Sequence, residues 1–315
     1  MKLLIDGVWR SGVEDTPALL LARTEERNRV FRSVVTADGG DGFRAESGRY
    51  HLYISYACPW AHRTVLYRRL KGLQDTVSMS VVHPVWGGPN GWEFKDTDLS
   101  SRDHVSGVQY LYQVYQAAKP DFTGKVTVPV LWDKKTRTIV NTESGDIIRM
   151  LNSEFDAFAD ASVDFYPQHL RGEIDSLNAV ILDRVCKGVY KAGFATTQSS
   201  YDQAIVELFE TLDDLDNRLS NSDFLIGNRV TESDWHLFAT LVRFDAAYHT
   251  KLKCSRKRLI DYANLSRYTA RLYGLPGVAE TTKLGHVKKH YFDDLGFGDP
   301  RIILADPEVD FRSVA

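Results

Sequence analysis

The sequence predicts a two-domain protein in which a mixed α/β domain precedes an all-α domain. Between residues 49 and 152, apolar runs of strand length alternate with amphipathic stretches of helical length. From residue 165 onward, apolar residues recur at spacings of three and four, which is typical of helices packed against one another. A chain of 315 residues is long enough for about two such domains.

The first 48 residues form an N-terminal extension with little regular periodicity. They include a glycine-rich stretch that ends at Gly42. Glycine-rich, aperiodic sequence is typical of loops. We expect residues 1–48 either to lie over the first domain or to be partly mobile.

The α/β domain is predicted to span residues 49–152. Its expected elements, in order, are a strand at Tyr50–Ser55, a helix at 60–70, a strand at Val77–His83, a helical stretch at 106–118, strands at Val126–Trp132 and Thr138–Val140, and a helix at Ser144–Leu151. A βαβ beginning followed by two adjacent strands and a helix is the thioredoxin arrangement.

A single cysteine, Cys58, stands between the first strand and the first helix and is followed directly by Pro59. The unpaired N–H groups and the dipole at a helix N-terminus favour a thiolate there. Proline suits the first helical position because its missing N–H would have no intrahelical partner. The sequence therefore predicts a reactive thiolate at Cys58, whereas Cys186 and Cys254 lie in helical stretches and are interpreted as structural.

No second cysteine lies within three residues of Cys58, so an internal disulfide cycle is not expected. A lone thiol of this kind forms a mixed disulfide with a partner from solution and is released by an external thiol. His62 follows four residues later, but a Cys-x₃-His pair offers too few ligands for a closed zinc site. We therefore expect no metal, and His62 and Arg63 either stabilise the thiolate or pack locally.

Val128 and Pro129 interrupt a predicted strand. Proline cannot donate to a β-ladder, so it marks a strand start, an edge or a special turn. A cis bond here would expose the Val128 backbone to an extended peptide, and the sequence does not decide between cis and trans.

A polar linker is predicted at 153–164, and an all-helical domain with a C-terminal tail at 165–315. Within it, Thr231 and Asp234 have the spacing of an N-terminal capping box at the start of an apolar helix. Apolar residues at helical spacing over Val180–Tyr190 and Tyr201–Leu219 predict two further helices.

Composition excludes several classes of function. A net charge of −3 gives no electrostatic basis for nucleic-acid binding. No apolar run approaches the roughly 20 residues that span a bilayer, and the N-terminus lacks the apolar stretch of a secretory signal. Three widely separated cysteines fit a reducing compartment, so we expect a cytoplasmic protein.

Several segments together resemble the cytosolic glutathione transferases, and within them the glutathionyl-hydroquinone reductases, also called the Xi class. The resemblance covers essentially the whole chain past residue 30. The matching segments are Gly48–Arg63, Gly91–Phe94, Val126–Asp133, Asn141–Ser144, Gly188–Phe194 and Lys289–Phe292.

The resemblance implies a glutathione site in the first domain. Glu143 and Ser144 would bind the γ-glutamyl ammonium and carboxylate, although Ser at such a position is also a common helix cap. Val128, held before Pro129, would pair with the backbone of the glutathione cysteine. Trp92 resembles the glutathione-contacting tryptophan of the family, and Lys95 is the expected cation for the glycine carboxylate.

The second domain would bind the acceptor. Tyr190 and Tyr291 resemble the hydroquinone-binding tyrosines of the family, where phenolic O–H groups can hydrogen-bond a quinol oxygen. The implied reaction is glutathione-dependent reduction of S-glutathionyl-hydroquinones through a mixed disulfide between Cys58 and glutathione. The resemblance also implies a homodimer.

Two other interpretations remain open. Omega-class transferases and glutaredoxin-like proteins also use a helix-start Cys-Pro, as thiol transferases or dehydroascorbate reductases. A non-catalytic scaffold of the same superfamily is the other alternative.

Overall fold

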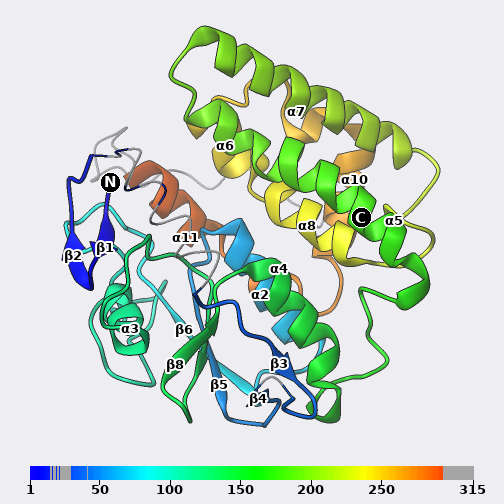
Figure 1. Ribbon diagram of the computed structural model, residues 1–315. Helices are drawn as coiled ribbons and strands as arrows, with labels where there is room; N and C mark the ends of the chain where they lie inside the picture. The colour runs from blue at the N-terminus through cyan, green and yellow to red at the C-terminus, as the bar shows by residue number, and fades with distance from the viewer. Residues whose placement is uncertain (15, 17–18, 20, 22–29, 41, 294–315) are drawn as a thin grey trace. The chain divides into compact units, whose positions relative to one another are not determined.

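The computed structural model describes residues 1–14, 16, 19, 21, 30–40 and 42–293, which form two compact units (Figure 1). Among the described residues, the first unit comprises Met1–Ala161 and Asp293, and the second comprises Ser162–Phe292. The division falls within the stretch 153–164 that the sequence assigns to a linker. The expected C-terminal tail lies beyond residue 293, outside the described residues.

A four-stranded mixed sheet forms the centre of the first unit. Its strands lie in the order β6 (Val77–Val81), β5 (Tyr50–Ile54), β7 (Val130–Asp133) and β8 (Thr138–Asn141). β5 is parallel to β6 and antiparallel to β7, which is antiparallel to β8. Every residue of β5 is buried, as expected for a central strand covered on both faces.

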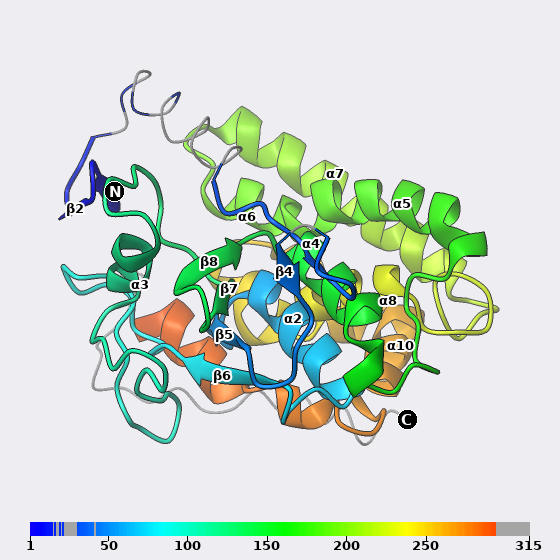
Figure 2. The ribbon, with the colours of Figure 1, turned by 60° about the horizontal axis from the view of Figure 1, so that its bottom comes forward.

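Helices cover both faces of this sheet. Figure 2 shows the sheet between α3 (Leu111–Ala118) on one side and α2 (Pro59–Leu70) with α4 (Ser144–Arg149) on the other. α4 continues into a π-helical turn at Met150–Glu154, which a 3-10 turn at Asp156–Phe158 follows. The predicted thioredoxin arrangement is therefore confirmed.

Two predicted elements of this unit begin several residues later in the structure. The helix expected over 106–118 begins only at Leu111, because the buried carboxylate of Asp103 accepts hydrogen bonds from the N–H groups of Val105, Ser106 and Val108 and holds them in a loop. The strand expected from Val126 begins at Val130, since Pro129 has no N–H to donate to the sheet. The Val128–Pro129 bond is cis.

The described part of the N-terminal extension lies over the first unit. β1 (Leu3–Ile5) and β2 (Val8–Arg10) form an antiparallel hairpin, and β3 (Val35–Thr36) pairs in parallel with β4 (Phe43–Arg44). Leu4 exchanges two backbone hydrogen bonds of 2.9 Å with Gly124, and the Ser33 N–H donates to the Val140 carbonyl. The described residues thus follow the first of the two expectations for this segment.

The second unit is helical throughout its described length. Its α-helices are α5 (Arg171–Val180), α6 (Gly188–Gly193), α7 (Gln198–Arg218), α8 (Glu232–Leu241), α9 (His249–Lys251), α10 (Ala263–Tyr273) and α11 (Leu284–Lys288). Short 3-10 turns lie at Gln168–Leu170, Leu259–Asp261 and Ala279–Thr281, and π-helical turns at Ile181–Cys186, Phe244–Tyr248 and Lys289–Asp293. The single helix expected at Val180–Tyr190 is thus divided.

The predicted capping box at the start of α8 is present. Asp234 Oδ2 accepts from the Thr231 N–H at 2.7 Å and from its hydroxyl at 2.9 Å. Asp234 Oδ1 accepts from the Leu225 N–H and the Tyr268 hydroxyl, both at 3.0 Å. This buried carboxylate therefore fixes both the start of α8 and the loop before it.

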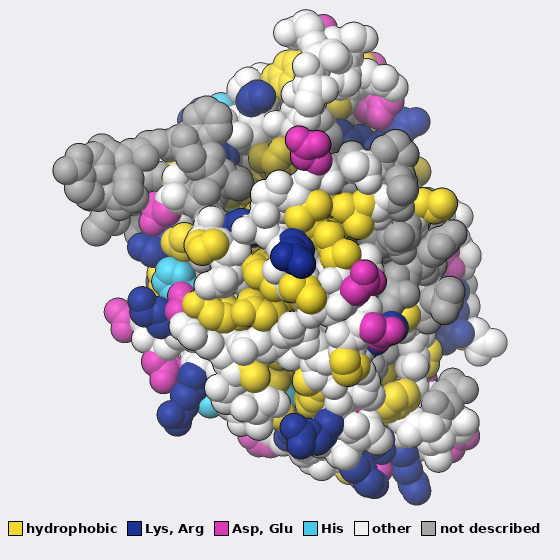
Figure 3. Space-filling view, turned by 60° about the vertical axis from the view of Figure 1, so that its left-hand side comes forward, with side chains coloured by type: hydrophobic (Ala, Val, Ile, Leu, Met, Phe, Trp, Pro, Cys, Tyr) yellow, Lys and Arg dark blue, Asp and Glu magenta, His cyan; other side chains and the backbone are white. Residues whose placement is uncertain are grey.

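No helix among the described residues is long and apolar enough to cross a membrane. Figure 3 shows a face of the molecule on which hydrophobic side chains gather around a basic side chain.

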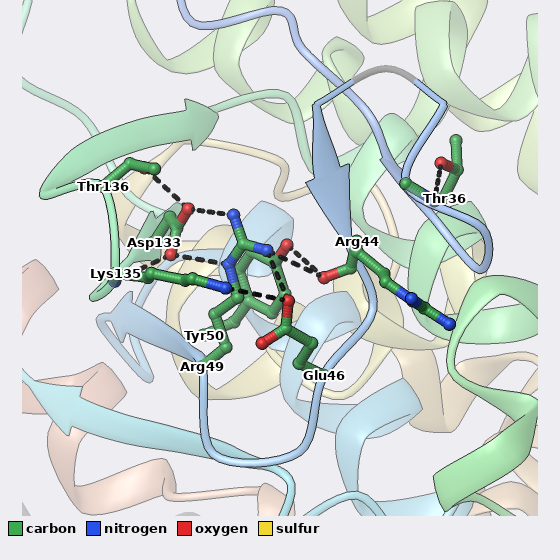
Figure 4. A network of polar contacts seen from close by, with 9 residues as sticks. Thr36, Arg44, Glu46, Arg49, Tyr50, Asp133, Lys135 and Thr136 are labelled. Carbon is green, nitrogen blue, oxygen red and sulfur yellow. Dashed lines mark hydrogen bonds and ion pairs between the residues drawn. The ribbon is translucent and has the colours of Figure 1, made fainter.

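A buried ion pair joins β7 to the residues before β5 (Figure 4). The Arg49 guanidinium donates to both oxygens of Asp133, at 2.9 Å from Nε and 2.6 Å from Nη2. The Lys135 N–H and the Thr136 hydroxyl donate to the same carboxylate, and Glu46 binds the remaining arm of Arg49 at 2.9 Å. The side chain of Asp133 is fully buried, and the Arg49 guanidinium balances its negative charge.

Candidate functional site

Cys58 is the N-cap residue of α2, and Pro59 takes the first helical position. β5 places it there, because the strand ends at Ile54 and the Cys58 N–H donates to the Ser55 carbonyl at 3.2 Å. The sulfur accepts a hydrogen bond from the Ala61 N–H at 3.5 Å, and it lies 3.6 Å from the Val128 carbonyl oxygen. A half-buried sulfur that faces helix N–H groups is in a setting that favours the thiolate.

The other two cysteines have no such setting. Both are buried, and burial raises the pKa of the Cys254 thiol to about 12. Cys186 donates to the His236 carbonyl at 3.4 Å and accepts from the Thr240 hydroxyl at 3.3 Å, inside the helical unit. All three cysteines are free thiols, and only Cys58 reaches the surface.

Arg63 connects the cysteine-bearing helix to the start of α4. Its side chain is buried, and Nη2 donates to Ser144 Oγ at 2.5 Å. The guanidinium carbon also lies 4.9 Å from the centre of the Trp60 ring, within the range of a cation–π contact. His62 is fully buried beside it. Sequence reasoning left the roles of both side chains open, and the structure shows that Arg63 holds the predicted ligand residue Ser144.

Val128 lies where a bound peptide could pair with it. The residue is 7% exposed, and its carbonyl faces the Cys58 sulfur. Among the described residues its N–H makes no hydrogen bond, because the β-ladder begins only at Val130. A buried N–H needs a partner, so this position suits the backbone of an extended ligand.

Glu143 precedes α4 as its N-cap, and its own N–H donates to Asn141 Oδ1 at 2.7 Å. An unforeseen cation faces it: Arg32, from the N-terminal extension, lies 3.7 Å from the Glu143 carboxylate and 3.1 Å from that of Asp146. Arg32 and Glu143 are more than a hundred residues apart in sequence, so no local sequence pattern could have predicted this ion pair.

Two backbone hydrogen bonds fix the chain at Trp92 and at the residue that follows it. The Leu111 N–H donates to the Trp92 carbonyl at 3.0 Å, and the His83 N–H donates to the Glu93 carbonyl at 2.7 Å. The Trp92 ring is half-buried, 6.2 Å from the centre of the Trp86 ring. The tryptophan is therefore presented by a fixed backbone.

Lys95 follows closely in the same loop and is exposed. Its carbonyl accepts from the Ser100 hydroxyl at 2.6 Å, which anchors its backbone. Lys125 is a second exposed lysine, three residues before Val128. It is therefore a second cation to compare with Lys95.

The second unit brings its two predicted tyrosines together. The hydroxyls of Tyr190, on α6, and Tyr291 are 2.7 Å apart. A third tyrosine that the sequence did not single out, Tyr248, lies with its hydroxyl 3.5 Å from that of Tyr190. Burial raises the pKa of Tyr248 well above its usual value of 10.0, so this phenol stays protonated.

The three phenols differ in exposure. Tyr248 and Tyr291 are 0% and 3% exposed, whereas Tyr190 is half-buried. Tyr190 is therefore the most exposed of the three tyrosines, and its hydroxyl lies within hydrogen-bond distance of the hydroxyls of Tyr291 and Tyr248. The described residues contain no group of three or more His, Cys, Asp or Glu side chains that could hold a metal ion.

Comparisons with known proteins agree with this architecture. The glutathione S-transferase N-terminal domain family matches residues 57–154, and the glutathione S-transferase C-terminal domain family matches residues 198–271. The first match covers Cys58, Val128 and Ser144, and the second covers the capping box of α8.

Relatives match over nearly the whole chain. The glutathionyl-hydroquinone reductase PcpF of Sphingobium chlorophenolicum is 48% identical over 292 residues, which cover 93% of this chain and 91% of PcpF. The glutathionyl-hydroquinone reductase YqjG of Escherichia coli strain K12 is 47% identical over 299 residues, which cover 93% of this chain and 90% of YqjG.

Solved structures extend the likeness to three dimensions. The Xi class glutathione transferase of Natrialba magadii superposes with a TM-score of 0.92 at 43% identity, covering 99% of this chain and 95% of that one. The glutathione-bound structure of YqjG superposes with a TM-score of 0.88 at 45% identity, covering 98% and 96%. The chain therefore belongs to the glutathionyl-hydroquinone reductases, the Xi class of the glutathione transferase family.

Proposed function

We propose that the protein reduces S-glutathionyl-hydroquinones to hydroquinones, with glutathione as the reductant. The observation that carries this proposal is the setting of Cys58: a lone free thiol at a helix N-terminus, between the Ala61 N–H and the Val128 carbonyl. Relatives named glutathionyl-hydroquinone reductases, nearly half identical over most of this chain, support the choice of substrate.

In the first step, the Cys58 thiolate attacks the sulfur of the conjugate. A sulfur–sulfur bond forms between Cys58 and glutathione, and the bond between sulfur and the aromatic carbon breaks. The electron pair of that bond stays with the aromatic ring, which takes up one proton and leaves as the hydroquinone. The thiolate must be the attacking form, and its position at the start of α2 supports that.

The glutathionyl part is held by the first unit. The unpaired N–H of Val128, before the cis-Pro129, suits the backbone of the glutathione cysteine. Glu143 and Ser144 are proposed to bind the γ-glutamyl end, and Trp92 to contact the peptide.

A cation is needed for the glycine carboxylate, and we propose Lys95 for this role. Substituting Lys95 with Met is expected to raise KM for glutathione while leaving kcat nearly unchanged. Lys125→Met is the matched comparison, because that lysine is also exposed and lies three residues before Val128. If only Lys125→Met raises KM, the assignment of Lys95 is wrong.

The aromatic leaving group needs help because carbon is a poor leaving atom. We propose that Tyr190 and Tyr291 donate hydrogen bonds to the hydroquinone oxygens and stabilise the charge that develops there. The 2.7 Å contact between their hydroxyls and the partial exposure of Tyr190 support this role.

In the second step, a glutathione thiolate attacks the mixed disulfide. It forms oxidised glutathione and returns Cys58 as the thiolate, so the cycle consumes two electrons from two glutathione sulfurs. We propose further that the protein is a cytoplasmic homodimer, as expected for a glutathione-dependent enzyme of this family.

The test is glutathione-dependent release of hydroquinone from a synthetic S-glutathionyl-hydroquinone. Wild type should turn over, Cys58→Ser should not, and Cys254→Ala should retain activity because its thiol is buried and protonated. Mass spectrometry of the wild type, treated with the conjugate alone, should detect one glutathionyl group on Cys58.

Absence of turnover in a wild type with reduced Cys58 would exclude the hydroquinone reaction. Reduction of a small glutathione mixed disulfide or of dehydroascorbate by that same protein would then favour the thiol-transferase alternative. Inactivity toward all of these substrates would favour the scaffold.

A further inference from the structure

We propose that the N-terminal hairpin, β1 with β2, is a positioning element of the glutathione site. In this proposal Trp9 and Lys2 hold the loop that presents Trp92, and Leu4 holds the segment that leads to Val128. The proposal rests on the assignment of the glutathione site in the proposed function.

The loop that precedes Trp92 has few internal backbone hydrogen bonds at its tip. It runs from His83 to Gly91 and contains two prolines and three glycines. It has no regular secondary structure, and Gly91 adopts a φ of +69°. A segment of this composition needs external contacts to hold one conformation.

Trp9 supplies the first of these contacts. Its indole N–H donates to the Pro89 carbonyl at 2.9 Å, at the loop tip. Its ring also stacks on that of Tyr112 in α3, with centroids 4.9 Å apart and planes 12° apart. One side chain of the hairpin thereby ties the loop to a helix of the α/β unit.

The fit between Trp9 and the loop is close. A Cβ added at Gly91 would lie 3.0 Å from Trp9 Cζ2 and 3.1 Å from Cη2, closer than most real Cβ contacts. The ring is therefore packed directly against the residue that precedes Trp92. A change in the position of Trp9 is transmitted to Trp92 through a single peptide unit.

Lys2 supplies a second contact. Its ammonium donates to the Trp86 carbonyl at 2.7 Å and lies 4.2 Å from the centre of the Trp86 ring. The Trp86 ring in turn lies 6.2 Å from that of Trp92. The hairpin thus contacts both the backbone and an aromatic neighbour of the proposed ligand residue.

The other strand of the hairpin reaches the second glutathione-binding segment. Leu4 exchanges N–H to carbonyl hydrogen bonds of 2.9 Å in both directions with Gly124, four residues before Val128. The Gly7 N–H donates to the Phe122 carbonyl at 3.0 Å, and Gln116 donates to the Gly7 carbonyl at 2.7 Å. One hairpin therefore fixes the spacing between Trp92 and Val128, which are proposed to bind the same peptide.

Such an arrangement lowers the ordering cost of binding. A loop that is already held in its binding conformation loses less conformational freedom when the ligand arrives. Removal of the Trp9 contacts should weaken glutathione binding without changing the environment of the Cys58 sulfur, which contacts the Ala61 N–H and the Val128 carbonyl rather than the hairpin.

The experiment measures binding of S-methylglutathione by calorimetry, so it requires no turnover. Trp9→Ala is expected to weaken binding about tenfold, and Lys2→Met by a few-fold, through loss of the hydrogen bond and ring contacts. Trp9→Phe, which keeps an aromatic ring on Tyr112, should recover part of the loss. Val8→Thr is the control, because Val8 lies on the same strand with its side chain 47% exposed.

A second readout separates positioning from general damage. The rate of Cys58 alkylation by iodoacetamide, followed against pH, should be the same in wild type and Trp9→Ala. Unchanged S-methylglutathione affinity in Trp9→Ala would overturn the proposal, and so would an altered alkylation profile in that variant. Wild-type protein that fails to bind S-methylglutathione would instead refute the glutathione site itself.

Discussion

The Arg49–Asp133 pair offers a sharp test of how the α/β unit is held together. Asp133→Asn keeps the shape of the side chain but removes its charge. The native carboxylate accepts four hydrogen bonds, two from Arg49 and one each from Lys135 and Thr136. An amide has only one oxygen, so at least one of these donors loses its partner and Arg49 keeps a buried charge.

The magnitude follows from the burial of both groups. The side chains of Arg49 and Asp133 are 7% and 0% exposed. Removing one partner of such a pair typically costs about 3–5 kcal/mol, because the remaining charge stays desolvated. For a unit of this size, about 4 kcal/mol corresponds to a fall in Tm of roughly 8–16 °C.

The pair also makes stability depend on pH. The Arg49 hydrogen bonds and charge hold the pKa of Asp133 below its usual 3.8, against the opposing effect of burial. A carboxyl with a lowered folded-state pKa stabilises the fold fully above the unfolded pKa, and that contribution is lost as the pH falls below about 4. Wild type should therefore lose stability on acidification through this range, and Asp133→Asn should lose less.

The assay is thermal unfolding followed by circular dichroism at neutral and acid pH. Asp121→Asn is the matched control. Asp121 also forms an ion pair at 2.6 Å, in this case with Lys119, but its side chain is 77% exposed. The control should melt with the wild type, since exposed pairs contribute little. Equal Tm values for Asp133→Asn and Asp121→Asn would refute the reasoning.

Three further predictions concern polar side chains of the two units. Tyr190→Phe and Tyr291→Phe should each lower kcat with the hydroquinone conjugate by about 10²-fold, measured by hydroquinone release; full activity would remove them from the reaction. Burial lowers the pKa of His51 to about 3, so its contribution to stability is complete above about pH 6.5 and falls by up to about 1.4 kcal/mol per pH unit below it. His51→Gln should reduce this slope in acid titrations followed by circular dichroism; an unchanged slope would contradict the assignment. Asp234→Ala should destabilise the helical unit by about 3 kcal/mol or more in chemical denaturation, because it leaves buried donors unpaired; a loss below about 1 kcal/mol would contradict the capping role.

Local sequence patterns predicted most of the fold correctly. α2 begins at Pro59, one residue before the predicted start, because a strand, a cysteine and a proline adjoin in sequence. The same local signals identified Cys58 as an N-cap. The helix predicted at 106–118 is too long, because the carboxylate of Asp103 accepts hydrogen bonds from residues before Leu111 and holds them in a loop. Hydrophobic periodicity does not encode such contacts.

The partners of charged and aromatic side chains could not be predicted in this way. Arg63 and Ser144 are 81 residues apart, and Trp9 and Pro89 are 80 apart. Each pairing depends on which helices, strands and loops become neighbours, so it can be identified only once the fold is known. Tyr248 was missed for the same reason, because one tyrosine among 15 has no local feature that distinguishes it.

Ser144 shows how a predicted ligand residue can have a second task. The sequence offered two roles for it, a helix cap or a glutathione ligand. In the structure the N-cap position belongs to Glu143, and Ser144 Oγ instead accepts from the buried guanidinium of Arg63. This contact is compatible with the ligand role, because a hydroxyl that accepts one hydrogen bond still has its own proton to donate. Accepting from a cation polarises the O–H and strengthens that donation. The buried arginine of the cysteine helix would therefore act on a bound carboxylate through Ser144, which couples the start of α4 to the helix that carries Cys58.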